Sequence, residues 1–210
     1  MSMQSSFNQP DNAIADRTDA ITPSEPHAVF GQPITTTPAN GQKQVILGMG
    51  CFWGAERKLW QQPGVVMTSV GYCGGSTQHP RYQDVCTGQT GHAEVVNVIF
   101  DPSVTSLDAL LTTFWENHDP TQGLRQGNDV GPQYRSAIYY CDPADQATVE
   151  ASLAAYQAAL KKAGKSDAVT TEIAPAGSYF LAETDHQQYL HKNPQGYCGL
   201  GGTGVCFPPQ

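Results

Sequence analysis

A cysteine stands where an apolar, strand-like run meets a helix-like run, in the stretch GMGCFWGAER (48–57). The helix behind Cys51 would aim free backbone N–H groups and a positive dipole end at the sulfur, which favours the thiolate. Thiolate is the nucleophilic form of cysteine. Phe52 and Trp53 follow at once and could form a pocket for something small and apolar. Considered alone, Cys51 could equally be a small buried cysteine at a glycine-flanked turn.

A second candidate for chemistry is Glu94, in the strand-like run AEVVNVIF (93–100). Because side chains alternate along a strand, Glu94 shares a face with Val96, Val98 and Phe100, which should face the core. A carboxyl there loses solvation, so its neutral form is favoured and can donate a proton. The alternative is a glutamate at a strand end whose carboxyl reaches water.

Two further cysteines, Cys198 and Cys206, lie in the glycine-rich stretch GYCGLGGTGVC (196–206). A flexible segment can bring one sulfur and then the other to a distant thiol. Two mobile cysteines and one fixed cysteine are the pattern of a thiol relay. The alternative is a pair of incidental tail cysteines, although idle exposed thiols are a liability.

Composition limits the possible functions. The chain has 210 residues, of which 39% are hydrophobic, enough for one core. It carries 19 acidic against 11 basic residues, a net charge of −8, which argues against nucleic acid or an anionic membrane as a partner. No signal peptide or bilayer-length apolar run is visible, so we expect a cytoplasmic protein. Without C-x-x-C or zinc-finger spacing, we expect no metal site, and we interpret Cys73, Cys86 and Cys141 as structural.

Periodicity and turn residues predict an α/β chain. Five strands are expected, at 44–50, 65–72, 93–100, 136–141 and 168–174. Three helices are expected, at 53–62, around 107–114, and from Asp142 and Pro143 to about Gly164. The order strand–helix–strand–strand–helix–strand, with a helix and a strand appended, predicts a mixed or antiparallel sheet covered by helices. Long loops are expected after Gly75 and over 119–135.

The chain divides by composition into three parts. We interpret residues 1–43 as a polar, loosely packed arm and 44–193 as the catalytic α/β domain. Residues 194–210 are too rich in glycine and proline for regular structure, so we expect an irregular tail that carries the two relay cysteines.

Six motifs, taken in order, resemble the A-type peptide methionine sulfoxide reductases. They are GCFWG (50–54), GYCGG (71–75), YQDVCTGQTGHAEVV (82–96), FWENHDPTQ (114–122), QGNDVGPQYRSAIYY (126–140) and DHQQYLHKNPQGYCG (185–199). The resemblance runs from about residue 44 to the C-terminus, and the tail is similar to that of the three-cysteine members. It implies a ferredoxin-like α/β sandwich that reduces the S epimer of methionine sulfoxide, free or in oxidised proteins.

The resemblance also implies residue roles. Cys51 would attack the sulfoxide and become a sulfenic acid, while Phe52 and Trp53 hold the methyl group. The residues implied around the sulfoxide oxygen are Tyr82, Glu94, Asp129 and Tyr134, with Glu94 as proton donor. The residues implied near the substrate, with less defined roles, are His186, Tyr189 and Tyr197.

The implied recharging path runs through two disulfides. A Cys51–Cys198 bridge would form first, and a Cys198–Cys206 bridge would then be reduced by thioredoxin, or by dithiothreitol in vitro. We expect no bound cofactor or metal, and a monomer.

On the residues alone, three other functions stay open. A cysteine hydrolase or acyl-transferase would pair Cys51 with His92, His118 or His186, but would need neither tail cysteines nor a reductant. A binding module would recognise oxidised methionine through the aromatic pair without turnover. A disulfide-stapled structural protein would show no reactive thiol.

Overall fold

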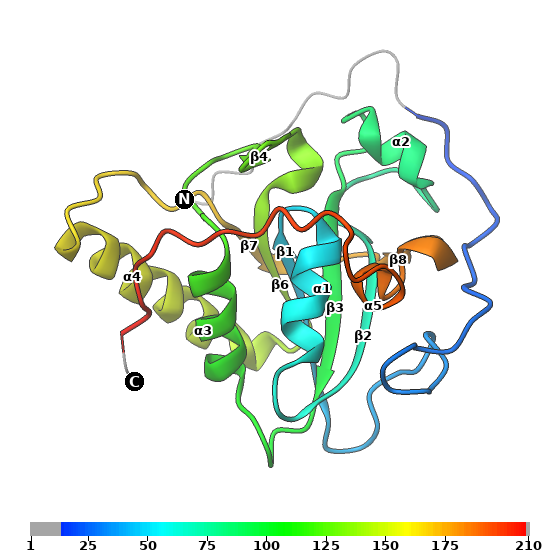
Figure 1. Ribbon diagram of the computed structural model, residues 1–210, viewed down its shortest axis with the longest axis horizontal. Helices are drawn as coiled ribbons and strands as arrows, with labels where there is room; N and C mark the ends of the chain where they lie inside the picture. The colour runs from blue at the N-terminus through cyan, green and yellow to red at the C-terminus, as the bar shows by residue number, and fades with distance from the viewer. Residues whose placement is uncertain (1–13, 209–210) are drawn as a thin grey trace.

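The computed structural model describes residues 14–208 of the chain and shows one layer of helices against a central sheet (Figure 1). The six strands of the sheet lie in the order β7-β6-β1-β3-β2-β8. Their bounds are β1 (Lys43–Met49), β2 (Val65–Cys73), β3 (Ala93–Phe100), β6 (Ser136–Tyr140), β7 (Glu172–Pro175) and β8 (Phe180–Leu181). A separate two-stranded hairpin consists of β4 (Arg125–Gln126) and β5 (Asp129–Val130).

Three longer helices cover one face of the sheet (Figure 1). They are α1 (Phe52–Trp60), α3 (Leu107–Asn117) and α4 (Gln146–Lys162), and the short helices are α2 (Tyr82–Cys86) and α5 (Tyr189–Lys192). Short 3₁₀ turns lie at η1 (Pro132–Tyr134), η2 (Pro143–Asp145) and η3 (Thr184–His186). The expected cap at Asp142 is present, because its carboxylate accepts the backbone N–H of Ala144 at the start of η2.

The predicted α/β sandwich with a mixed sheet is confirmed. Strands β6, β1, β3 and β2 are antiparallel neighbours, the order of a βαββαβ unit, and β7 adds in parallel to β6. The first four predicted strands agree with the structure to within one residue. The predicted strand at 168–174 begins later, at Glu172, because only this part pairs with β6.

The main core lies between the sheet and the three longer helices. Leu47 of β1, Val96 of β3, Leu59 of α1 and Trp115 of α3 are all fully buried there. Val96 shares its strand face with Glu94, so the expectation that Glu94 faces the core is correct. This packing ties the helix that begins beside Cys51 to the strand that carries the carboxyl.

Both predicted long loops hold short elements that hydrophobic periodicity did not indicate. In the first, Asp84 accepts the backbone N–H of Arg81 and so begins α2. In the second, the side chain of Gln126 bonds both the N–H and the C=O of Asp119, at 3.0 and 2.8 Å. Polar side chains order both segments, so apolar spacing carried no signal.

The N-terminal arm is packed more closely than predicted. Residues 14–42 run along the outside of the α/β body (Figure 1), and His27 and Ile34 are buried against it. The His27 ring bonds Thr68 Oγ1 of β2 at 2.9 Å. Isolated buried residues such as these recur at no regular spacing, so they cannot be recognised in a polar sequence.

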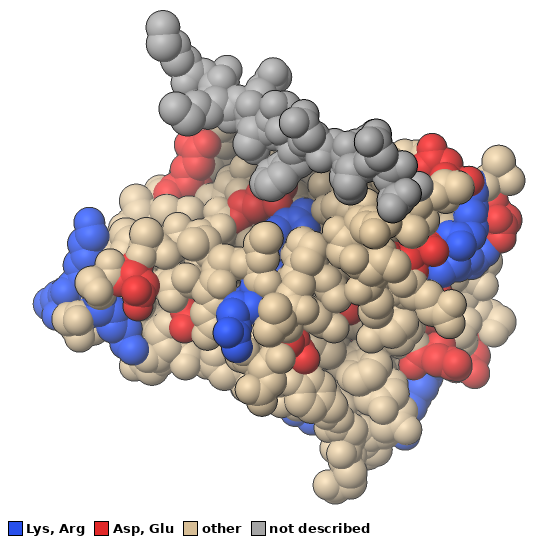
Figure 2. All heavy atoms as spheres, turned by 90° about the horizontal axis from the view of Figure 1, so that it is seen from above, with Lys and Arg blue, Asp and Glu red and all other residues tan. Residues whose placement is uncertain are grey.

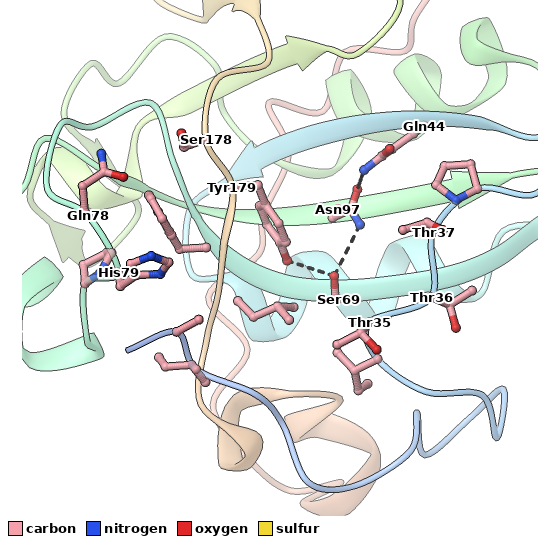
Figure 3. Close-up of a pocket in the computed structure, with 17 residues that line it drawn as sticks. Thr35, Thr36, Thr37, Gln44, Ser69, Gln78, His79, Asn97, Ser178 and Tyr179 are labelled. Carbon is pink, nitrogen blue, oxygen red and sulfur yellow. Dashed lines mark hydrogen bonds between the residues drawn. The ribbon is translucent and has the colours of Figure 1, made fainter. Parts of the chain in front are cut away.

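A cavity of about 560 Å³ lies between this arm and the face of the sheet that the long helices leave open (Figure 3). A row of hydrogen-bonded polar groups lines it, in which Ser69 contacts both Tyr179 and Asn97. None of the sequence-predicted site residues lines this cavity.

The C-terminal tail is irregular, as predicted, but it is held in place. It crosses α1 and α3 (Figure 1), and Phe207 at its end is buried in the main core. The backbone N–H of Phe207 donates to Glu116 Oε1 at 2.8 Å, and its ring stacks on Tyr156 of α4. The segment predicted to act as the relay is therefore anchored at its far end.

Acidic and basic side chains are interspersed on the face that Figure 2 shows, and the described residues form no broad basic area there. Within residues 14–208, no helix is long and apolar enough to cross a membrane.

Replacing Phe207 with alanine should release the tail while leaving the body folded. Burying a phenylalanine stabilises by about 1.5–3 kcal/mol, so local opening should become at least about tenfold more frequent. We expect thermolysin to cleave before Leu200 or Val205 faster by that factor, as followed by mass spectrometry. Val104→Ala, at an exposed apolar position, is the matched control. Equal cleavage of both variants would show that the tail is held elsewhere.

Candidate active site

Cys51 occupies the corner between β1 and α1, directly before the first helical residue. Gly50 precedes it with φ +91°, a conformation that favours glycine. A Cβ on Gly50 would lie only 2.6 Å from Cγ of Gln126, so no side chain fits there. The corner is therefore rigid, and it holds the Cys51 sulfur at one place above the sheet.

Cys51 is a thiol in this site, which differs from the thiolate that the sequence suggested. The backbone N–H of Trp53 favours the thiolate, but burial, followed by the nearby Glu94, raises the pKa of Cys51 well above its ordinary value. The other expected donor is used elsewhere, because the N–H of Phe52 donates to Glu94 Oε2 at 3.1 Å. Loss of solvation thus outweighs the helix terminus.

Glu94 is buried, with 1% of its surface exposed, and does not reach water. Burial raises its pKa to about 8, and the charge of Asp129 acts in the same direction. The hydrogen bond from Phe52 opposes this shift but does not cancel it. At pH 7 a group with this pKa is protonated in roughly nine molecules of ten. Glu94 can therefore donate a proton at neutral pH.

Two phenols lie around the same carboxyl. Tyr82 begins α2 and Tyr134 ends η1. Burial, and then the proximity of Glu94, raises the pKa of both hydroxyls, so each keeps its proton and can donate a hydrogen bond. Asp129 of β5 accepts the hydroxyl of Tyr197 at 3.1 Å. These groups form a polar end of the site that suits an oxygen atom.

An aromatic wall forms the other end of the site. The Trp53 indole N–H donates to His186 Nδ1 at 3.1 Å, and the ring of Tyr189 stacks on Trp53 with centroids 3.8 Å apart. The Phe52 ring lies 5.4 Å from His186, also centroid to centroid. Burial lowers the pKa of His186, so this ring stays neutral and suits an apolar surface.

The tail brings Cys198 to the first turn of α1. A Cβ added to Gly54 would lie 3.0 Å from Cys198 Sγ and 2.9 Å from Leu200, so the bare backbone of Gly54 admits this approach. Cys206 is placed differently. It directly precedes Phe207, whose ring stacks on Tyr156 of α4, so it lies at the anchored end of the tail. The structure thus gathers the sequence-predicted site residues except Cys206.

Sequence reasoning missed two residues that support the site. Glu183 accepts the hydroxyl of Tyr72 at 3.0 Å and the backbone N–H of Tyr82 at 2.9 Å. It thereby joins β2 to the start of α2. The only feature of the sequence that could have pointed to them is their position: Tyr72 lies within the GYCGG motif, and Glu183 lies shortly before DHQQYL.

Each histidine that a cysteine hydrolase could use has at least one ring nitrogen in a hydrogen bond to another group. The His92 ring contacts the C=O of Thr77 and the N–H of Gly75, and the His118 ring contacts Phe114 and Ser136. Nδ1 of His186 accepts from Trp53. Over residues 14–208, no group of three or more Cys, His, Asp or Glu residues is arranged to hold a metal ion.

The three cysteines interpreted as structural have different surroundings. All six cysteines of the chain are free thiols. Cys73 is buried in the smaller core on the second face of the sheet. Cys86 and Cys141 are exposed, and their structural role stays a prediction. The Cys86 thiol also bonds the Tyr82 hydroxyl, at the edge of the site.

Residues 43–203 match the family model described as peptide methionine sulfoxide reductase. The chain is 61% identical to "Peptide methionine sulfoxide reductase MsrA" of Vibrio vulnificus, over 95% of each chain. It is similar to the solved structure of methionine sulfoxide reductase A of Corynebacterium diphtheriae, with a TM-score of 0.82 and 44% identity over 94% of this chain and 96% of that one. A solved structure of Mxr1 from Saccharomyces cerevisiae in complex with Trx2 is 24% identical, with a TM-score of 0.50, over 74% of this chain and 90% of that one.

Alkylation should show the raised pKa of Cys51. Only the thiolate reacts, so iodoacetamide should label Cys51 at least roughly tenfold more slowly than the exposed Cys206 at pH 7.5. Peptide mass spectrometry of the reduced protein over time measures both rates in one sample. Labelling of Cys51 as fast as that of Cys206 would mean that the helix terminus prevails over burial.

Proposed function

Since the chain belongs to the peptide methionine sulfoxide reductase family, we propose that Cys51 reduces the S epimer of methionine sulfoxide, free or in proteins. The enzyme reduces methionine sulfoxide to methionine, and the division of labour among its residues is our proposal. The observation that carries it is a buried thiol beside a buried, protonated carboxyl, between a polar and an aromatic end.

The two ends of the site suit the two ends of the sulfoxide. The methyl group would lie against Phe52 and Trp53, where burying apolar surface is favourable. The oxygen would lie toward Glu94, Tyr82 and Tyr134, which offer hydrogen-bond donors. With the attacking sulfur fixed between these ends, only one arrangement of the substituents at the sulfoxide sulfur fits.

The reduction step transfers two electrons from one sulfur to another. As Cys51 loses its proton and its sulfur attacks the sulfoxide sulfur, Glu94 gives its proton to the oxygen. The protonated oxygen then passes to the Cys51 sulfur as the S–O bond of the substrate and the newly formed S–S bond both break, so methionine leaves and Cys51 carries the hydroxyl as a sulfenic acid. The proton released by the thiol replaces the one that Glu94 supplied, so the step needs no proton from outside. The substrate sulfur is reduced and the Cys51 sulfur is oxidised.

The tail would then regenerate the thiol. Cys198, lying over Gly54, attacks the sulfenic acid to form the Cys51–Cys198 disulfide and release water. Cys206 attacks Cys198 next, which frees Cys51 and leaves a Cys198–Cys206 disulfide. For this second exchange the tail has to leave its anchor, because Phe207 is buried beside Tyr156 and Glu116.

The remaining assignments rest on the family. We propose thioredoxin as the physiological reductant of the tail disulfide, in keeping with the yeast Mxr1 structure that contains Trx2. We also propose a cytoplasmic monomer that uses no bound cofactor or metal, with 44–193 as the catalytic part and 194–210 as the relay tail.

An assay that separates the two epimers tests the assignment. With dabsyl-methionine sulfoxide and dithiothreitol, the enzyme should consume only the S epimer, and Cys51→Ser should consume neither. Without reductant, Cys198→Ser should release about one methionine per enzyme, because only regeneration is blocked. Cys206→Ser should stop at a Cys51–Cys198 bridge. Equal turnover of both epimers, or a bridge from Cys51 to Cys73 or Cys86, would contradict the proposal.

Glu94→Gln tests the proton donor. The amide keeps the shape but cannot release a proton, so single-turnover methionine formation should slow by about 10²-fold or more, with substrate affinity retained. In the unmodified enzyme this step should slow as pH rises through about 8, because Glu94 then loses its proton. That decline should be absent in Glu94→Gln and preserved in Glu94→Asp. An unchanged rate in Glu94→Gln would reduce Glu94 to a structural role.

A further inference from the structure

A second buried carboxyl, Glu56, lies on α1 one turn beyond Trp53 and takes no part in the chemistry described above. It is fully buried, and the basic group beside it is the neutral His27 ring, with Nε2 3.9 Å from Oε1. Three donors converge on Glu56. Thr68 Oγ1 and Gln188 Nε2 donate to its Oε1 at 2.9 and 2.7 Å, and the backbone N–H of Gln188 donates to its Oε2 at 2.8 Å. A buried group with this many bonds joins several elements at once.

The N-terminal arm completes this hydrogen-bonded group through His27. Nδ1 of His27 accepts the backbone N–H groups of Val29 and Phe30, both at 3.1 Å, so the proton of the ring is on Nε2. Nε2 therefore donates to Thr68 Oγ1, at 2.9 Å, and Thr68 donates onward to Glu56. Burial lowers the pKa of His27 to about 4, so the ring is neutral, accepts at Nδ1 and donates at Nε2.

Gln188 is the part of this group that reaches the site. Its backbone has φ +47°, which is unfavourable for a residue with a side chain. Both its backbone N–H and its side-chain amide are held by Glu56, and its Oε1 accepts the N–H of Ala28 in the arm. Two segments, α1 and the N-terminal arm, thus hold one strained residue in place.

The strained residue lies within the segment that builds the aromatic wall. His186 stands two positions before Gln188 and Tyr189 directly after it. Both rings contact Trp53, one through the indole hydrogen bond and one by stacking. Trp53 itself is on α1, three residues before Glu56. The carboxylate therefore ties both halves of the wall, helix and turn, to each other.

We propose that Glu56 is a positioning residue for substrate binding: through Gln188 it fixes the turn that presses His186 and Tyr189 against Trp53, and the N-terminal arm stabilises the same turn through His27 and Ala28. This inference rests on the proposed placement of the methyl group against Trp53. Glu56 acts on the affinity for the sulfoxide, whereas Cys51 and Glu94, which it does not touch, set the rate of the chemical step.

Two variants of the full chain test this role. Glu56→Gln places an amide N–H₂ against donors, and Thr68→Val removes the hydroxyl that links His27 to Glu56 while keeping its shape. In single-turnover methionine formation over a range of sulfoxide concentrations, Glu56→Gln should raise the half-saturating concentration about tenfold, equal to about 1.4 kcal/mol. The maximal rate should change by less than about threefold. Thr68→Val should shift in the same direction by a smaller factor.

Ser69→Ala is the matched control. Ser69 follows Thr68 on β2, is equally buried, and loses a comparable hydroxyl, but it faces the cavity on the other side of the sheet (Figure 3). It should leave both quantities unchanged. Equal effects of Thr68→Val and Ser69→Ala, or a fall in maximal rate without a loss of affinity, would overturn the proposal. If Glu56→Gln does not fold, Thr68→Val against Ser69→Ala decides the question.

A double variant separates this inference from the proposed function. If Glu56 acts through the wall, Thr68→Val should add no further loss of affinity in a Trp53→Leu background. Full additivity would place its effect elsewhere and overturn the positioning role. If Trp53→Leu by itself left the affinity unchanged, the methyl-binding assignment would fail, and the inference with it.

Discussion

The site depends on the exclusion of water from a carboxyl and a thiol that lie side by side. In water Glu94 would be ionised at neutral pH and Cys51 would be closer to its ordinary pKa. Burial raises both pKa values, and each group in its charged form would disfavour charge on the other. The resting site therefore holds two protons, one on Cys51 and one on Glu94. Because these protons stay within the site, a charge-neutral exchange with the substrate is possible.

The rest of the fold keeps water out and keeps the geometry fixed. The α1 helix buries Phe52 and Leu59 against the sheet, so the corner at Cys51 cannot shift without opening the core. Glu183 secures the start of α2 and with it Tyr82. On the aromatic side, Glu56 holds the turn behind Trp53 in place by accepting the backbone N–H of Gln188. The half-buried carboxyl group of Glu183 and the fully buried one of Glu56 thus act as structural links on the two sides of Glu94.

The proposed relay places two opposing requirements on the tail. Cys198 has to lie near Cys51, and the glycine at position 54 allows this close approach. Cys206 has to reach Cys198 later, yet Phe207 is packed into the core beside it. The burial of Phe207 stabilises the docked tail by only about 1.5–3 kcal/mol, so it can order the tail and still allow the tail to be released.

The order of the elements, the alternation that turns Glu94 inward and the motif around Cys51 were all determined by the sequence, because they depend on local periodicity and turn chemistry. Tertiary structure alone decided the protonation of Cys51, since burial outweighs the helix terminus that the sequence displays. It also decided the packing of the arm, because single buried contacts such as His27 with Thr68 have no period. The docking of Phe207 and the links through Glu183 and Glu56 join residues far apart in the chain, and no local pattern encodes such pairs.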